Sequence, residues 1–364
     1  MPKRRTIYIN ARFLTAPLTG IQRFGREVLR EWDNMIQEGA INGSQFRFIL
    51  LSPTIPSDMP SYRHLDLQIM GRLRSHLWEQ ISLPLFTRGH FLINLGNTAP
   101  AFKKEQAVSI MDLQVWARPS THSFFFNRVY GFIVPRAVRN ARTVLAISNS
   151  TSLELEKWFQ HPTSETTVTC CSHEHVLRTP SQPDCLAKHN LLADNFLLAV
   201  SSLNPNKNFL AILQATKEAD IHIPFVIVGG TNPKVFAGQG IDALPKEVIH
   251  VGRVSDGELR ALYENALGFV YPSFYEGWGL PPGEAMQLGC PVISSHTSSL
   301  PEVCGDAALY CDPADVSSLA AQLKRLVNEP ALRDELREKG KKQIARFSWR
   351  KSAQRAWQAI EACL

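Results

Sequence analysis

The stretch Tyr271-Pro-Ser-Phe-Tyr-Glu-Gly-Trp-Gly-Leu-Pro-Pro-Gly-Glu-Ala-Met, residues 271–286, decides the fold of this chain. An apolar run that ends near Tyr271 predicts a buried strand. A loop with two glycines follows, and two prolines then stand where a helix begins. Glycine lets the backbone approach a ligand closely, and the free N–H groups of a helix N-terminus attract an anion. This order predicts an anion-binding turn at the end of a strand.

Two glutamates, Glu276 and Glu284, lie eight residues apart at opposite ends of this loop. We expect Glu284 in the first turn of the helix and Gly289 just after its end. Each carboxylate can accept hydrogen bonds from the hydroxyls of a different sugar, and a nucleotide sugar offers one sugar on each side of a pyrophosphate. The alternative is that Glu284 only complements the helix dipole and that Glu276 is solvated.

A second motif lies at residues 197–209, where a buried strand runs into a polar loop that ends at Lys207, just before a helix at Asn208. A lysine at this place can contact phosphate oxygens beside the helix N-terminus. The alternative is an ordinary surface lysine. Because both motifs follow strands in the same half of the chain, together they favour a phosphate site more than either does alone.

Gly20, in the segment 17–23, opens a predicted helix after the first strand and is a weaker candidate, since an ordinary turn explains it as well. The segment lacks the G-x-G-x-x-G pattern of dinucleotide binding. No Asp-x-Asp pair occurs in the sequence, so no carboxylate clamp for Mn²⁺ or Mg²⁺ is evident. Of the eleven histidines, His64, His76, His90 and His122 show no spacing typical of metal ligands.

Short apolar runs alternate with helix-length amphipathic stretches along both halves of the chain. This alternation predicts an α/β fold with parallel sheets covered by helices on both faces. The predicted strands are residues 6–9, 46–51, 91–94, 107–110, 143–147, 196–200, 225–228, 248–251, 268–271 and 291–294. The predicted helices include residues 22–33, 127–140, 208–218 and 256–266.

The alternation is interrupted between residues 161 and 190, a segment with three prolines and no clear periodicity, which we interpret as an interdomain linker. The length of 364 residues suits two domains. We place them at residues 1–175 and 185–349. Two doubly wound domains that face each other leave a ligand cleft at the carboxyl ends of their strands.

The composition is that of a water-soluble globular protein, with 44% apolar and 20% charged residues and no apolar run of ~18 residues that would span a membrane. Seven scattered cysteines without a C-x-x-C pair indicate reduced thiols in a cytosolic protein.

The net charge of +6 is uneven, because residues 1–190 hold 22 lysines and arginines against 14 acidic residues. A basic first half suits an anionic partner, either a phospholipid surface, a lipid pyrophosphate or a nucleic acid, and solvated surface charge is the alternative. Residues 124–142 join the run Phe124-Phe125-Phe126 to four arginines, which favours peripheral docking on an anionic membrane; a core helix with a solvated basic edge is the alternative.

The chain resembles the family-4 retaining glycosyltransferases (group 1), which have the GT-B fold of two Rossmann-like domains. The spacing of Glu276 and Glu284 looks like the paired-glutamate motif of that family, and the similarity continues through residues 289–293 and 299–308. It also reaches residues 19–23, 77–84, 146–150 and 251–256, and so covers nearly the whole chain.

The resemblance implies a role for each matching residue. Lys207 would contact the donor pyrophosphate, Glu276 the transferred sugar and Glu284 the nucleotide ribose. The remaining donor-site residues implied are Gly20 at the phosphates, Gly277, Trp278, Gly279 and Leu280 near sugar and phosphate, and Arg253 and Val254 near the base. The first domain would bind the acceptor, the second the nucleotide sugar, and a last helix at residues 350–364 would cross back onto the first domain.

Two departures from the family are visible. Residues 201–206 hold no basic residue, where the family often has an arginine before its phosphate lysine. Met111-Asp112-Leu113 replaces a common His-Asp-Leu, so the family histidine beside the reacting sugar is missing. We expect Met111 to pack on the sugar, and Asp112 to point to the other side of the strand end.

The sequence therefore predicts a cytoplasmic, metal-independent, retaining hexosyltransferase of polysaccharide or lipopolysaccharide biosynthesis, with membrane association on the cytoplasmic face. It needs no cofactor; its partners are a nucleotide-sugar donor, with GDP-mannose suggested by the resemblance, and a glycan or lipid-linked acceptor, with no nucleic acid. The alternatives are a nucleotide-sugar epimerase of the same fold and an inactive sugar-nucleotide-binding protein.

Overall fold

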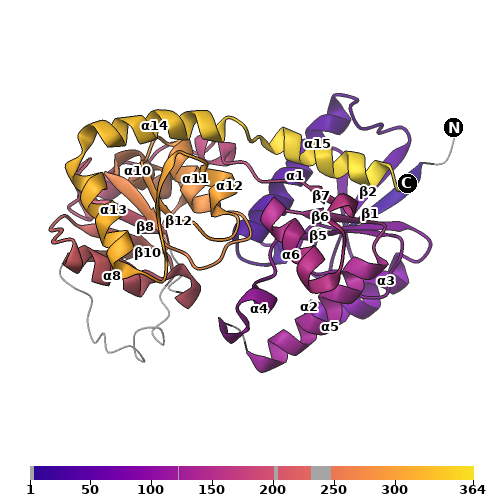
Figure 1. Ribbon diagram of the computed structural model, residues 1–364. Coiled ribbons are helices and arrows are strands. Elements are labelled where there is room, and N and C mark those ends of the chain that lie inside the picture. Colours follow the sequence, from indigo (N-terminus) through magenta and orange to yellow (C-terminus); the bar gives the residue numbers. More distant parts are fainter. Residues whose placement is uncertain (1–3, 122, 201–203, 231–246) are drawn as a thin grey trace. The chain divides into compact units, whose positions relative to one another are not determined.

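A computed structural model describes residues 4–121, 123–200, 204–230 and 247–364 (Figure 1). The chain forms two compact units: the first comprises Met1–Cys171 with Trp349–Leu364, and the second comprises Ser172–Ser348. The predicted boundaries, 1–175 with 350–364 and 185–349, differ mainly at residues 172–184, which belong to the second unit. Among the described residues, no helix combines the length and the apolar character that crossing a bilayer requires.

The first unit is built on a parallel sheet in the order β3-β2-β1-β4-β5-β6-β7. Its strands are β1 (Arg5–Asn10), β2 (Phe46–Ser52), β3 (Leu65–Ile69), β4 (Phe91–Asn94), β5 (Gln106–Ile110), β6 (Thr143–Ala146) and β7 (Thr166–Val168). Its helices are α1 (Gly20–Gln37), α2 (Ser75–Leu77), α3 (Leu83–Phe86), α4 (Gln114–Ala117), α5 (Phe124–Asn140), α6 (Asn149–Phe159) and α15 (Trp349–Glu361), with a π-helical turn η2 (Trp78–Ser82) between α2 and α3.

The second unit is built on a parallel sheet in the order β10-β9-β8-β11-β12-β13. Its strands are β8 (Leu197–Val200), β9 (Phe225–Val228), β10 (Val248–Gly252), β11 (Gly268–Tyr271), β12 (Val292–Ser295) and β13 (Ala308–Cys311). Its helices are α7 (Asp184–Lys188), α8 (Phe209–Glu218), α10 (Asp256–Asn265), α11 (Leu280–Gln287), α12 (Leu300–Cys304), α13 (Val316–Asn328) and α14 (Pro330–Ile344), with short helical turns η5 (Glu174–Leu177) and η6 (Pro205–Lys207).

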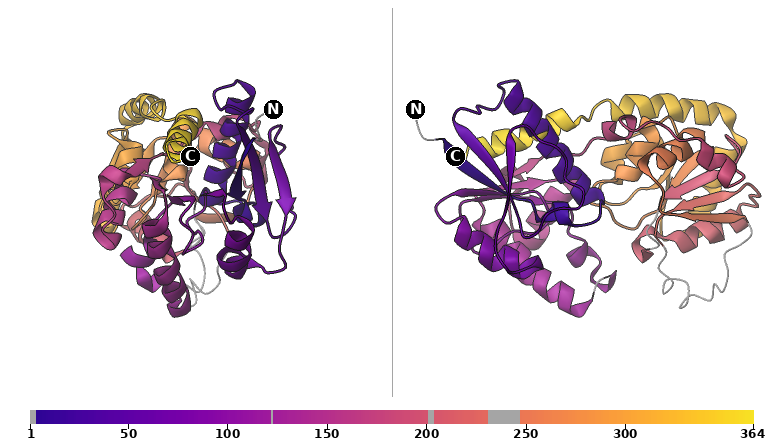
Figure 2. Two further views of the ribbon diagram at one scale, coloured as in Figure 1. Left: turned by 90° about the vertical axis from the view of Figure 1, so that its right-hand side faces the viewer. Right: turned by 180° about the vertical axis from the view of Figure 1, so that it is seen from behind.

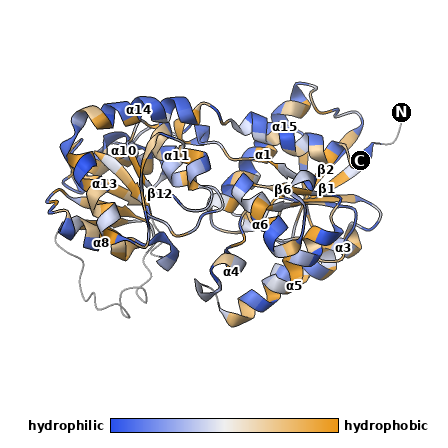
Figure 3. Cartoon of the chain, viewed as in Figure 1, coloured by the Kyte–Doolittle hydropathy of each residue, from blue (hydrophilic) through white to orange (hydrophobic). Residues whose placement is uncertain are grey.

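The apolar runs of the sequence became the strands at the centre of each unit, and helices cover them with apolar faces inward and polar faces outward (Figure 3). All ten predicted strands and the four predicted helices are confirmed, and both sheets are parallel as expected. The missed strands β3, β7 and β13 all lie at the edges of the two sheets.

The last helix, α15, packs beside α1 within the first unit (Figures 1 and 2). Its buried residues recur at helical spacing: Trp349, Ser352, Ala353, Ala356, Trp357 and Ile360. Trp357 meets the rings of Trp32, Phe46 and Phe48 edge-on, and the indole N–H of Trp32 donates to the Ala353 carbonyl at 2.9 Å. The first unit therefore takes part of its core from the end of the chain.

Candidate active site

The glycine loop between β11 and α11 has the conformation that the sequence predicted. Gly279 has φ +125°, and a Cβ there would lie 2.8 Å from the Leu300 side chain, so only glycine fits. Helix α11 begins at Leu280 with prolines at its first positions, and Gly289 follows its end with φ +76°. The loop thus enters the helix through a turn that other residues would strain.

Lys207 and Glu276 meet in the second unit, where the chain leaves the neighbouring strands β8 and β11. Residues 201–203 of the predicted 197–209 motif lie outside the described residues. The Lys207 Nζ lies 2.6 Å from Glu276 Oε1 and donates to the Tyr271 hydroxyl at 2.5 Å. Burial opposes a charged Lys207, but Glu276 and Tyr271 outweigh it and raise its pKa. Burial and Glu276 raise the pKa of Tyr271. The site therefore holds a permanent cation beside a neutral phenol.

Side chains from elsewhere in the second unit fix the backbone of this loop. Ser298 Oγ accepts from the Glu276 N–H at 2.8 Å. The Ser299 hydroxyl lies 2.9 Å from the Glu276 carbonyl and 2.6 Å from the Trp278 carbonyl. The Asn206 amide donates to the Tyr275 carbonyl at 2.6 Å, which ties the lysine loop to the glutamate loop. These contacts pre-organise the two loops relative to each other.

Glu284 does not lie where the sequence predicted. The first turn of α11 holds no acidic residue, and Glu284 sits one turn further in, so it cannot act as a dipole-complementing residue at the N-terminus. Its Oε1 lies 2.9 Å from His175 Nε2, and its Oε2 accepts from the Tyr263 hydroxyl at 3.3 Å. Burial and the nearby Glu284 raise the pKa of Tyr263 well above its ordinary value, so this phenol stays a donor.

His173 packs against the glycine loop through Trp278. It is fully buried, and its Nε2 accepts from the Trp278 indole N–H at 3.3 Å. Burial, reinforced by His175, lowers the pKa of His173 to about 3, so the ring is neutral at physiological pH with its proton on Nδ1. A Cβ at Gly283 would lie 2.1 Å from His173 Nε2, so this glycine lets α11 contact the ring closely.

The other predicted residues are spread over both units. Arg253 is exposed and Val254 half-buried, just after β10, and the Arg253 guanidinium lies close to Gly230 after β9. Gly277, Trp278 and Leu280 belong to the loop and the first turn of α11.

Gly20, Met111 and Asp112 belong to the first unit. Gly20 opens α1, as predicted, and Thr19 and Gln22 cap that helix. Met111 is only 6% exposed, and its N–H donates to Asn97 Oδ1 at 2.8 Å. Asp112 accepts from the Gln114 N–H. These three residues therefore belong to the first unit, and the lysine–glutamate pair belongs to the second.

Sequence reasoning missed Tyr271, Tyr263, His175, Ser298 and Ser299. Their contacts join residues far apart in the chain, and His175 falls in the segment interpreted as a linker. The residues flanking Glu276 and Glu284 do not reveal these partners. Among the residues that the structure describes, no group of three histidine, cysteine or acidic side chains could hold a metal ion; that the reaction proceeds without metal stays a prediction.

The known proteins that this chain resembles are glycosyltransferases. The family model described as glycosyl transferases group 1 matches residues 184–343. The chain is 29% identical to the O-antigen chain mannosyltransferase B of Escherichia coli, over 92% of this chain and 93% of that protein. It is 28% identical to the O-antigen chain mannosyltransferase RfbU of Salmonella typhimurium, over 71% of this chain and 73% of that protein.

Solved structures share the fold along the whole chain. A sucrose-phosphate synthase from Thermosynechococcus elongatus matches with a TM-score of 0.75 and 18% identity, covering 99% of both chains. WaaG, a glycosyltransferase involved in lipopolysaccharide biosynthesis, matches with a TM-score of 0.69 and 13% identity, covering 98% of this chain and 99% of that one. The predicted GT-B fold with two Rossmann-like units is thereby confirmed.

Proposed function

We propose that this chain, whose residues 184–343 match the group 1 glycosyl transferases, transfers a mannosyl residue from a nucleoside diphosphate mannose, with GDP-mannose as the first candidate, to a growing glycan. The similarity to two O-antigen mannosyltransferases supports mannose and a polysaccharide or lipid-linked acceptor. The observation that carries the chemistry is the contact between Lys207 and Glu276 beside the glycine loop.

Lys207 would stabilise the leaving nucleoside diphosphate. The C1–oxygen bond to the donor phosphate breaks, and negative charge develops on that phosphate. Lys207 stays positively charged because its pKa is raised, and α8 begins two residues after it, so helix N–H groups add to its field. Loop N–H groups from Gly277 to Leu280 would bind the same anion, in place of a metal.

Glu276 would hold the hydroxyls of the transferred mannose. The acceptor hydroxyl oxygen would form its bond to C1 on the face that the diphosphate leaves, and its proton would pass to the departing phosphate oxygen. This retaining route needs no protein base. It agrees with a site whose lysine is protonated and whose Tyr271 keeps its proton.

Glu284 would bind the nucleotide ribose. His175 and Tyr263 each contact one oxygen of its carboxylate and so fix its position on α11, which follows the glycine loop. Arg253 and Val254, after β10, would lie near the base, and Gly20 would offer its N–H to the phosphates.

A donor panel tests the proposal. We expect GDP to raise the melting temperature more than UDP, ADP or dTDP, because a ligand that binds the native state stabilises it. With GDP-[¹⁴C]mannose and a lipid-linked glycan, label should enter the glycan. Release of free epimerised sugar without transfer would indicate an epimerase, and GDP binding without turnover an inactive binding protein.

We also propose that the first unit docks on an anionic membrane at the cytoplasmic face. Phe124 and Phe125, which open α5, are 76% and 77% exposed, and Phe102 and Phe132 lie edge to face nearby. Arg128 stands over the Phe124 ring and Arg136 over the Phe132 ring. We call these six residues the aromatic–basic surface. Rings that insert and arginines that meet lipid phosphates are the two elements of such docking.

Vesicle co-sedimentation tests the docking. The wild type should sediment with vesicles that contain anionic lipid at low salt, and much less with neutral vesicles or at high salt. The variant Phe124→Ser/Phe125→Ser should lose binding. The control Leu153→Ser, which changes an apolar residue of α6 whose exposed fraction is 60%, should bind like wild type. Binding that is indifferent to lipid charge and salt would refute the proposal.

A further inference from the structure

The first unit has a topological switch point between β1 and β4. The chain proceeds from β1 to β2 and β3 on one side of the sheet and from β4 to β7 on the other, and ligands of such sheets bind at the carboxyl ends of the two strands at the switch. Asn10 ends β1 and Asn94 ends β4, and their side chains are hydrogen-bonded at 3.1 Å. A ligand site is therefore expected at this pair.

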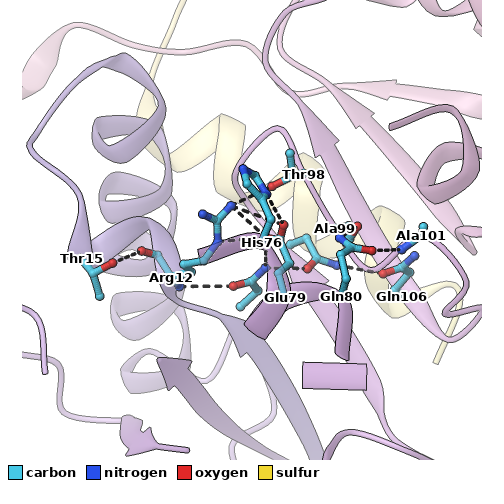
Figure 4. A network of polar contacts seen from close by, with 11 residues as sticks. Arg12, Thr15, His76, Glu79, Gln80, Thr98, Ala99, Ala101 and Gln106 are labelled. Atoms are coloured by element: carbon cyan, nitrogen blue, oxygen red, sulfur yellow. Dashed lines mark hydrogen bonds and ion pairs between the residues drawn. The ribbon is translucent and has the colours of Figure 1, made fainter. Parts of the chain in front are cut away.

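A buried ion pair lies at this switch point (Figure 4). The Glu79 side chain is 1% exposed, and its Oε1 accepts from the Asn10 amide at 2.9 Å and from Arg12 Nη2 at 3.2 Å. His76 Nδ1 lies 3.5 Å from Glu79 Oε2. Burial opposes ionisation of Glu79, but the contacts with His76 and Arg12 lower its pKa, so the carboxylate is charged.

The pair is poorly explained by stability alone. Burying an ion pair costs desolvation that its attraction often fails to offset, so a packed apolar pair would serve the fold as well. Glu79 also lies in η2, a π-helical turn, and such turns occur frequently at functional sites. Both observations favour a binding role for the segment 77–84.

A pocket of about 200 Å³ opens onto the ion pair. At ~30 Å³ for each water of the liquid, this is the volume of about seven waters, which is on the order of one sugar ring. Its walls belong to the first unit alone. The residues that line it include Arg12, Ala16, Gln22, Glu79, Asn97 and Tyr130.

Three side chains of the pocket have N–H donors that the described contacts do not use. Arg12 uses Nε and Nη2 on Glu79 and Thr98, and its Nη1 has no partner among the described residues. Asn97 accepts at Oδ1 from the N–H groups of Met111 and Asp112, and Gln22 accepts at Oε1 from the Thr19 N–H. In both amides the described contacts engage only the oxygen.

The charge of the pocket selects the ligand class. Glu79 compensates the charge of Arg12, so the pair presents no net positive charge to a phosphate. Hydroxyl groups suit it better, because each can accept from the amides and the guanidinium and donate to a carboxylate.

We propose that the Arg12–Glu79 pocket binds one uncharged sugar, the terminal residue of the acceptor glycan. The acceptor role rests on the proposed function; the binding of a neutral sugar does not. Asn97 lines the pocket and also accepts from the N–H groups of Met111 and Asp112, which follow the end of β5. An acceptor that contacts the Asn97 amide would therefore lie one side chain away from these two residues.

Saturation-transfer NMR on the full chain with methyl α-D-mannopyranoside tests the site. We expect transfer to the glycoside, at least a fivefold loss in Arg12→Gln, and a similar loss in Ala16→Leu, which fills the pocket but leaves the ion pair intact. The control Arg47→Gln, which breaks an exposed pair with Asp66, should bind like wild type. Lys207→Ala, in the second unit, should also retain the signal.

In turnover, the two pocket variants Arg12→Gln and Ala16→Leu should show a tenfold or larger rise in acceptor KM, with an unchanged dissociation constant for GDP. Unchanged glycoside binding in both pocket variants, with native melting curves, would overturn the inference, and so would a signal lost in Lys207→Ala. A protein that binds the glycoside in this pocket but fails to use GDP-mannose would refute the proposed function and leave the pocket standing.

Discussion

Lys207 and Glu276 are each other's partner: the ammonium nitrogen lies 2.6 Å from the carboxylate oxygen, although the two residues are 69 positions apart in the chain. The hydroxyl of Tyr271, at the end of β11, accepts a hydrogen bond from the same ammonium group. Because each charge positions the other, losing either one changes the position and the electrostatic field of its neighbour. The following expectations depend on this coupling and on the contacts around it.

Replacing Lys207 by alanine should cost about 2–4 kcal/mol of transition-state stabilisation, as expected for a pre-organised donor at a developing charge. The fold should persist, because the residue ends a short helical turn at a loop. Steady-state kcat/KM measures the effect. Lys217→Ala, an exposed lysine in the last turn of α8, is the matched control. Wild-type kinetics in Lys207→Ala would remove this lysine from the site.

Replacing each of the two glutamates by alanine should have a different effect on nucleotide affinity and on turnover. Glu284→Ala should weaken the binding of free nucleoside diphosphate and also destabilise the protein by about 1–3 kcal/mol, since it leaves the buried His175 and Tyr263 without their acceptor. Glu276→Ala should lower turnover and weaken nucleotide affinity less than Glu284→Ala does, since its own proposed contact is with the transferred sugar. Calorimetry with the nucleotide alone separates the two; equal losses of affinity would contradict the assignment of ribose and sugar ends.

The buried His173 should make stability depend on pH. Its folded pKa of about 3 lies below the ordinary 6.5, so the unfolded chain binds a proton that the folded chain does not. The stabilisation is fully present above pH 6.5 and is lost as pH falls towards 3, by about 1.4 kcal/mol per pH unit.

Urea unfolding at pH 7 and at pH 5.5 measures this term as the difference between wild type and His173→Gln. The difference should shrink by about 1.3 kcal/mol at the lower pH. His222→Gln, which changes a histidine whose side chain is 81% exposed, should show almost no such dependence. Parallel pH profiles for wild type and His173→Gln would show that His173 is not the group responsible.

Transfer should survive EDTA. The sequence has no Asp-x-Asp pair, and Lys207 with the N-termini of α8 and α11 can provide the positive field that a metal would otherwise supply. Activity is measured after dialysis against the chelator, with and without added Mn²⁺. Complete loss of activity that Mn²⁺ restores would exclude a metal-free reaction.

Met111→His should keep the fold and leave turnover equal or higher, because imidazole can donate a hydrogen bond and a thioether cannot. The Met111 N–H contact with Asn97 involves only backbone atoms of residue 111, so the substitution retains it. Met111→Ala should mainly raise the donor KM through lost packing. If Met111→His abolishes turnover while donor binding is normal, the groups at the sugar differ from those of relatives with a histidine here.

The sequence predicted the centre of each sheet better than its margins. Central strands such as β9 and β11 are buried along their whole length and read as continuous apolar runs. The missed β3 alternates apolar and polar residues, and β7 has three half-buried residues, because an edge strand buries less of its surface. Their pairing is decided by the neighbouring strand and not by their own composition.

The site shows the same division. Lys207, Gly279 and the two glutamates could be predicted as site residues because each lies in a short strand–loop–helix segment that is recognisable from neighbouring residues. That Glu284 lies in the second turn of α11 and is held by His175 and Tyr263 could not be predicted, since these partners come from a connecting segment and from α10. Long-range side-chain pairing depends on tertiary packing, which one sequence does not display.

The packing of α15 on the first unit has a consequence for synthesis. While the ribosome adds residues 172–348, the nascent first unit lacks the helix that covers Trp32, Phe46 and Phe48. At 5–20 residues per second this interval lasts roughly 10 to 35 seconds. During that time an aromatic face is open to chaperones and to aggregation. The second unit, made without interruption, can finish folding before the first, although the first leaves the ribosome earlier.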